Sequence, residues 1–214
     1  LNIVPVLLVV FFIIFNLTFT SVTRPDGSKA YVSSSKVNEM NNLIAENSDN
    51  SIDELEQLLS DNPNLVYYLD ANLDGVLEKG WKTGNARIVE IALENGAVFD
   101  NPQKYEHMAH AHGSIEDYLS YLLERSLTDD DVRIIELMFE NNASTDTRRT
   151  YNGEGVYSNL FGEAVWNLLY NDETVTDTEL AFLQVFIDNG LSSDDYILLH
   201  WDIPSNYHFS PDIH

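Results

Sequence analysis

GNARIVEIALENGA, at Gly84–Ala97, is followed later in the chain by DDVRIIELMFENNA, at Asp130–Ala143. A third copy of the pattern, ELAFLQVFIDNGL, occupies Glu179–Leu191, and a fainter one runs from Ile52 to Pro63. Apolar residues recur four positions apart in each copy, which places them on one face of a helix. The Gly or Asn at positions 96, 142 and 190 can adopt the left-handed conformation that ends a helix. The pattern therefore predicts four helices, which we call outer helices.

Each outer helix is expected to pair with an inner helix that precedes it in the chain. The apolar spacing predicts these inner helices at residues 37–45, 73–82, 115–125 and 158–170. One helix pair cannot bury its own apolar face, whereas stacked pairs share a continuous core. The sequence therefore predicts an all-α domain of about four helix pairs over residues 36–195.

Three consecutive acidic residues, Asp129, Asp130 and Asp131, resemble a calcium-binding cluster at first sight. They follow Thr128 and precede an apolar helical pattern, and carboxylates are favourable at the positive end of a helix. We therefore interpret them as the start of an outer helix.

The outer-helix pattern resembles the ankyrin-repeat family, whose consensus outer helix runs from Gly-Asn or Gly-His through paired aliphatic residues to Gly-Ala. Gly84–Asp100 matches this consensus closely. The family's inner-helix signature, Thr-Pro-Leu-His-x-Ala-Ala, is matched at Leu77 and Gly80 but not at Val76, Glu78 or Trp81. The resemblance covers residues 37–195 and implies an ankyrin-like solenoid, a fold that binds other proteins.

The copies of the pattern are spaced more widely than ankyrin repeats. Gly96 and Asn142 are 46 residues apart, and Asn142 and Gly190 are 48 apart, against a usual period of about 33. Inserts are therefore expected at residues 99–113 and 144–157, where ankyrin folds carry the projecting finger between repeats. Another solenoid of helical hairpins also fits this spacing.

Composition narrows the class of partner. The chain has 35 acidic residues against 11 Lys and Arg, a formal charge of -24, which would repel the phosphates of nucleic acids. The same field would speed association with a basic protein. There is no cysteine, so disulfides and thiolate metal sites are excluded. We expect another protein as the partner, and neither nucleic acid nor a small-molecule substrate.

The N-terminal region is apolar. No charged residue precedes Arg24, and Ile3–Phe15 is an unbroken apolar run. Residues 1–23 are therefore expected to form a hydrophobic helix, either a transmembrane anchor or an export signal. This predicts a single-pass membrane protein or one exported to the bacterial periplasm or cell envelope. Residues 24–35 are expected to be a linker, and residues 196–214 a C-terminal tail that caps the stack.

A cluster of three histidines is the main candidate for chemistry. His107, His110 and His112 have a spacing that could bring imidazoles to a metal such as zinc. No His-Glu-x-x-His motif accompanies them, and His107 also falls where His stands in the ankyrin inner-helix consensus. We therefore expect no metal and no cofactor, with a metal-dependent hydrolase that uses this cluster as the alternative.

The inserts hold the residues that we predict to contact a partner. Tyr and Arg are frequent anchors of protein interfaces, and histidine can join them. The candidates are Tyr105, His107, His110, Arg148, Arg149 and Tyr151.

Common catalytic motifs are absent from the sequence. It contains no Gly-x-Ser-x-Gly elbow, phosphate-binding loop, dinucleotide fingerprint or EF-hand loop. The sequence therefore predicts a protein-binding module and not an enzyme. By analogy with short, acidic repeat proteins, it fits an inhibitor of the bacterial envelope or an immunity protein that neutralises a toxin.

Overall fold

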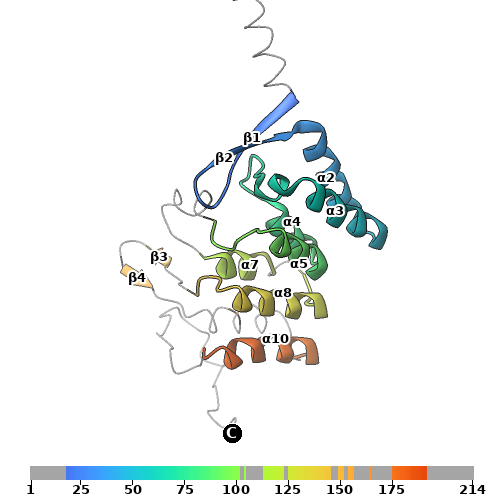
Figure 1. Ribbon diagram of the computed structural model, residues 1–214. Helices are drawn as coiled ribbons and strands as arrows, with labels where there is room; N and C mark the ends of the chain where they lie inside the picture. The colour runs from blue at the N-terminus through green and yellow to red at the C-terminus, as the bar shows by residue number, and fades with distance from the viewer. Residues whose placement is uncertain are drawn as a thin grey trace, which may run out of the picture.

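The computed structural model describes residues 18–101, 104, 113–122, 125–145, 149–151, 154–156, 164 and 175–191. These residues are mostly helical, with two short antiparallel hairpins (Figure 1). The all-α prediction is confirmed at this level. The inner helix predicted at residues 158–170, apart from the helical residue Ala164, and the tail predicted at residues 196–214 lie outside the described residues.

The helices form two rows. The inner row consists of α2 (Ser34–Glu46), α4 (Val76–Thr83) and α7 (Ser114–Leu122). The outer row consists of α3 (Asp49–Asp61), α5 (Ala86–Glu94), α8 (Asp129–Glu140) and α10 (Asp177–Asp188). Neighbouring helices contact each other within each row, and each inner helix also contacts the outer helix that follows it. Figure 1 shows these layers succeeding one another from α2 and α3 down to α10. A short 3-10 helix, η1 (Pro63–Tyr67), follows α3.

Polar side chains fix where the outer helices begin. Ser48, Asn85 and Thr176 each accept a hydrogen bond from the backbone N–H three residues later, as N-cap residues do. In α8 the backbone N–H of Thr128 donates to the Asp131 carboxylate at 2.8 Å. The three aspartates of this segment lie in the first turn of α8, as the sequence predicts.

Three outer helices end in the same way. The side-chain amides of Asn95, Asn141 and Asn189 donate to the carbonyl oxygen four residues earlier, at 2.9, 2.9 and 2.8 Å. The next residue has a positive φ of 92° at Gly96, 56° at Asn142 and 84° at Gly190. The N–H after it donates to the carbonyl five residues back, which is the closing bond of a Schellman motif. The recurring Asn-Gly or Asn-Asn pair therefore produces one helix end three times.

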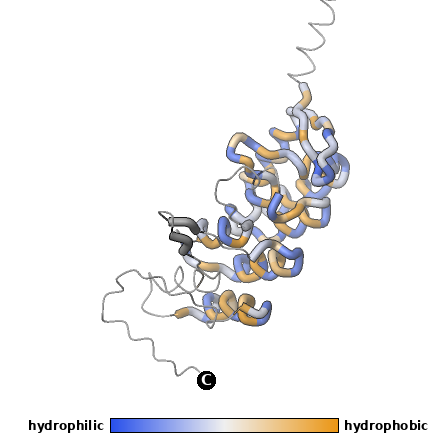
Figure 2. The backbone as a smooth tube through the Cα atoms, turned by 90° about the vertical axis from the view of Figure 1, so that its left-hand side faces the viewer, coloured by the Kyte–Doolittle hydropathy of each residue, from blue (hydrophilic) through white to orange (hydrophobic). Residues whose placement is uncertain are grey.

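The buried apolar side chains form one cluster that extends from Val22 in the first hairpin to Phe186 in α10. Figure 2 shows hydrophobic and hydrophilic bands succeeding one another along the helices. The buried residues of each helix recur at helical spacing, as in Ile52, Leu55 and Leu59 of α3, so each helix has an apolar face. Asp100 joins the loop after α5 to the start of α7 and to the loop after α8, because its carboxylate accepts from the backbone N–H of Ser114 at 2.7 Å and of Ser144 at 2.5 Å. The layers therefore share both a core and loop contacts.

Two hairpins precede and interrupt the helices. Strand β1 (Phe19–Thr23) pairs with β2 (Lys29–Ser33), and β3 (Arg149–Tyr151) pairs with β4 (Glu154–Val156). The second hairpin falls within the insert predicted at residues 144–157. The first replaces most of the linker predicted at residues 24–35, where the structure has a turn, β2 and the start of α2. Alternate side chains of this hairpin, Val22, Ala30 and Val32, are buried in the core, which explains why the segment folds against the helices.

The prediction of a single-pass membrane protein is wrong. Across the described parts of the chain, no helix is long and apolar enough to cross a membrane. The last residues of the predicted anchor, Phe19–Thr23, form strand β1 and not the end of a helix. Thr18, Thr20 and Thr23 interrupt the apolar run there, and β-branched residues favour a strand. Residues 1–17 lie outside the described residues, and the exported alternative stays a prediction.

Candidate functional site

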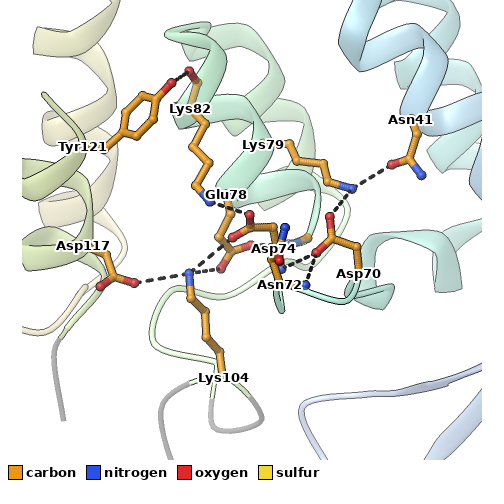
Figure 3. A network of polar contacts seen from close by, with 11 residues as sticks. Asn41, Asp70, Asn72, Asp74, Glu78, Lys79, Lys82, Lys104, Asp117 and Tyr121 are labelled. Carbon is orange, nitrogen blue, oxygen red and sulfur yellow. Dashed lines mark hydrogen bonds and ion pairs between the residues drawn. The ribbon is translucent and has the colours of Figure 1, made fainter. Parts of the chain in front are cut away.

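A buried lysine occupies the centre of the inner row. The Lys104 ammonium lies 3.2 Å from the Asp117 carboxylate of α7, 3.7 Å from Asp74 and 3.9 Å from Glu78 of α4 (Figure 3). Only 5% of Lys104 is exposed. Its ammonium also lies 5.5 Å from the centroid of the Trp81 ring, within the range of a cation–π contact. Lys104 therefore ties the start of the first insert to both α4 and α7.

Two further lysines extend this group into a network that crosses the inner row. Lys79 donates to Asn41 of α2 at 2.8 Å and pairs with Asp70 at 3.1 Å. Lys82 pairs with Asp74, and its carbonyl oxygen accepts the hydroxyl of Tyr121 of α7 at 2.7 Å. Figure 3 shows these contacts running from α2 past α4 to α7. We call this set the inner-row network; its members are Asn41, Asp70, Asp74, Glu78, Lys79, Lys82, Lys104, Asp117 and Tyr121.

Burial and charge act differently on two carboxyl groups of the network. Glu78 is 4% exposed, and burial raises its pKa although the Lys104 ammonium and the backbone N–H of Gly75 act to lower it. For Asp70, burial also acts to raise the pKa, but the hydrogen bonds from Lys79 and from the N–H groups of Asp74 and Asn72 outweigh it. The net pKa of Asp70 is therefore below its ordinary value.

The raised pKa of Glu78 predicts how pH changes the stability of the Glu78→Gln variant relative to the wild type. Between the ordinary value of 4.5 and its raised pKa, folded Glu78 binds a proton that the unfolded chain releases, so its contribution to stability increases as pH falls. The amide of Gln can still accept from the Gly75 N–H but cannot ionise. We expect the variant to gain stability relative to the wild type from about pH 5 to about pH 7. Urea unfolding at both pH values measures this difference. Glu54→Gln, at an exposed position of α3, is the control. If Glu78→Gln and the wild type differ in unfolding free energy by the same amount at both pH values, the raised pKa of Glu78 is contradicted.

The network is built for holding the helices together and offers little room for a substrate. Each of its three ammonium groups is paired with at least one carboxylate. The small cavity beside it, lined by Gly75, Glu78, Tyr67 and Val98 among others, measures about 20 Å³, enough for a water molecule. Within the described ranges, no three His, Asp or Glu side chains are grouped as a metal ion would need.

A second buried carboxylate joins α7 to α8. Asp131 is fully buried and accepts from the hydroxyl of Tyr118 at 2.6 Å, from both terminal nitrogens of Arg125, and from the N–H and hydroxyl of Thr128 at 2.8 Å. Burial alone would raise its pKa, but the bonds from Arg125 and Tyr118 hold that pKa below its ordinary value. Burial and the neighbouring carboxylate raise the pKa of Tyr118, so its phenol stays protonated and donates.

The helices that contribute to the inner-row network also carry exposed polar residues. Asn38 and Asn42, four residues apart on α2, are exposed, and so is Ser120 on α7. The outer row instead presents ion pairs between successive helices: Arg87 with Glu56 at 2.7 Å, and Arg133 with Glu90 at 3.1 Å. The two rows therefore offer chemically different surfaces.

Most of the partner-binding residues predicted from the sequence fall in the two inserts, outside the described residues. Tyr105, His107, His110 and Arg148 lie outside the described residues, and so does His112, the third histidine of the candidate metal cluster. Arg149 and Tyr151 contribute their backbone to β3, opposite Val156 and Glu154.

The inner-row network was not predicted from the sequence. Its one sequence signal is Glu78, which stands where the ankyrin consensus has His and whose carboxylate accepts from the Gly75 N–H at 2.9 Å. Comparisons with protein-family models, with curated proteins and with solved structures find no match to this chain. The ankyrin resemblance of Gly84–Asp100 therefore stays a prediction from the residues themselves.

Proposed function

We propose that this protein is a binding module for another protein, built as an ankyrin-like solenoid of helix pairs. The observation that carries the proposal is the outer-helix end that recurs at Asn95, Asn141 and Asn189 with the same hydrogen bonds. Equivalent helix ends at successive layers are what a stack of repeats requires. Such stacks present an extended surface, and binding is their usual role.

The inner row is the surface that we assign to the partner. The inner-row network links α2 to α4 through the Lys79–Asn41 hydrogen bond, and α4 to α7 through the ion pairs of Lys104 and the Tyr121 hydrogen bond, which hold the helices in fixed relative positions. A surface that is rigid before binding loses less entropy when it binds. Asn38, Asn42 and Ser120 supply exposed polar groups on this surface, and the half-buried Tyr121 supplies an aromatic ring.

The partner that fits best is a basic protein. The formal charge of -24 attracts a positively charged surface and accelerates its association. An inhibitor or immunity protein that covers a basic toxin is one function of this kind. Within this proposal the chain has no catalytic role.

Capture from a lysate of the source organism by the immobilised full chain tests the proposal. We expect at least one basic protein to be retained at low salt and released as salt rises, because screening weakens attraction between exposed charges. Resin coupled to polyglutamate at the same density of charge is the control, since it presents acidic charge without a folded surface. Equal retention on both resins would show attraction to acidic charge alone and would contradict the proposal.

A further inference from the structure

Among the described residues, α10 is the last outer helix, and it exposes an apolar face that is covered in the earlier outer helices. Aligned by their helix ends, Val89 of α5, Ile135 of α8 and Leu183 of α10 are equivalent. Val89 and Ile135 are fully buried, whereas Leu183 is only partly buried. The apolar side chains on one side of α10 are therefore less buried than their equivalents in α5 and α8.

At two more positions on the same side, the residue of α10 is more exposed than its equivalent in α8. Phe139 of α8 is partly buried against the core and meets the ring of Phe186 of α10 at 5.4 Å, so the next outer helix covers it. Its equivalent in α10 is Ile187, which is 48% exposed. Val132 of α8 is likewise packed against the core, and its equivalent Leu180 is 55% exposed. α10 thus presents the face that in α8 receives a following helix.

The opposite end of the outer row is polar. On α5 and α8 the positions that face the preceding helix hold Arg87 and Arg133, which pair with the helix before. Glu54 is their equivalent on α3, the first outer helix of the described residues, and it is exposed. A terminal element of a repeat stack needs a polar outer face to stay soluble. α3 meets this requirement and α10 does not.

We propose that the C-terminal residues 192–214 of this same chain pack on the face of α10 formed by Leu180, Leu183 and Ile187. These 23 residues follow Leu191 directly and include Ile197, Leu198 and Trp201. Extended, they reach about 75 Å, against about 18 Å for the twelve residues of α10. They contain neither Lys nor Arg, so they suit an apolar face better than the acidic surfaces elsewhere. This packing concerns the fold and holds whether or not the proposed partner exists.

The absence of cysteine from the chain allows a direct test. Ile187→Cys is introduced into the full chain and into a chain that ends at Leu191, and the rate of thiol alkylation is measured for each. We expect alkylation at position 187 to be about tenfold slower in the full chain, because a packed segment excludes the reagent. Val98→Cys, at a 42% exposed position after α5, should react equally fast in both.

Full-chain Ile187→Cys with Trp201→Ser and Ile197→Ser repeats the test without truncation, and it should react at the faster rate. Equal rates for Ile187→Cys in all three chains would overturn the proposal. Protection that persists after truncation and grows with protein concentration would also overturn it, because a second copy would then be the occupant. An unchanged rate at Val98→Cys shows that the reagent reacts alike with an exposed thiol in both chains, and an unchanged helical circular dichroism spectrum shows that the shortened chain is folded.

Discussion

Asp131→Ala is expected to lower the free energy of unfolding by about 3–5 kcal/mol, the cost of removing one partner from a buried ion pair. The Asp131 carboxylate is fully buried and accepts from Arg125, Tyr118 and Thr128. Without it, the fully buried Tyr118 hydroxyl and the partly buried Arg125 guanidinium lose their shared partner. Urea unfolding of wild type and variant, followed by circular dichroism, measures the loss.

Asp129→Ala is the matched control for Asp131→Ala. Asp129 lies in the same first turn of α8 but is exposed, so its removal should cost less than about 1 kcal/mol. Similar losses for both variants would mean that only the helix end matters and not the buried cluster.

The lowered pKa of Asp131 also predicts how acid affects the stability of the protein. Its folded pKa lies below the ordinary value of 3.8, so its contribution is present above that value and is lost as pH falls through the folded pKa. The difference in unfolding free energy between wild type and Asp131→Ala should therefore shrink at pH values below 3.8. Urea unfolding across this range measures it, and a constant difference would contradict the assignment.

Trp81→Ala should cost a similar amount, about 3–5 kcal/mol, through loss of buried surface and the cavity that remains. Trp81 is 1% exposed and lies between the rings of Phe99, at 6.2 Å, and Tyr118, at 6.1 Å. It belongs to α4, while its neighbours belong to the loop after α5 and to α7, so the loss should loosen contacts between layers. Circular dichroism in urea gives the unfolding free energy without using Trp81 as the reporter.

Trp81→Phe separates ring contacts from simple volume, because it keeps an aromatic ring in the same place. We expect it to cost clearly less than Trp81→Ala. An alanine variant that unfolds at the wild-type urea concentration would contradict the central position of Trp81 in the core.

The outer helices could be predicted because each carries its own local instructions. Apolar spacing sets the buried face, and the Asn-Gly or Asn-Asn pair sets the end, as at Asn95 and Asn141. The predicted helix at 130–143 corresponds to α8 at Asp129–Glu140. Local signals of this kind need no knowledge of distant residues.

The first hairpin was missed for the opposite reason. Phe19–Thr23 continues an apolar run that has no charge, so its composition resembles the end of a membrane segment. Its strand character depends on Lys29–Ser33, which pairs with it across a turn and places Val22 and Val32 in the core. Pairing across a turn is a weaker signal than an apolar run of this length.

The inner-row network could not be predicted from spacing. Lys104 is 30 residues from Asp74 and 13 from Asp117 in the sequence, and no local motif joins them. Only the packing of α4 against α7 brings their charges within reach of one another. The histidines and aromatic residues of the inserts lie close together in the sequence, which is why they were predicted to bind the partner. The functional surface that we propose lies on the inner helices instead.

Binding of the captured partner to two single-arginine variants tests the central claim most directly. Asn42→Arg adds one positive charge to the exposed face of α2 in the inner row, and Gln57→Arg adds the same charge to the exposed face of α3 in the outer row. If the inner row receives a basic partner, Asn42→Arg should raise the Kd about tenfold and Gln57→Arg less than about twofold. An equal effect of both variants, or a larger effect of Gln57→Arg, would contradict the assignment of the inner row as the binding surface.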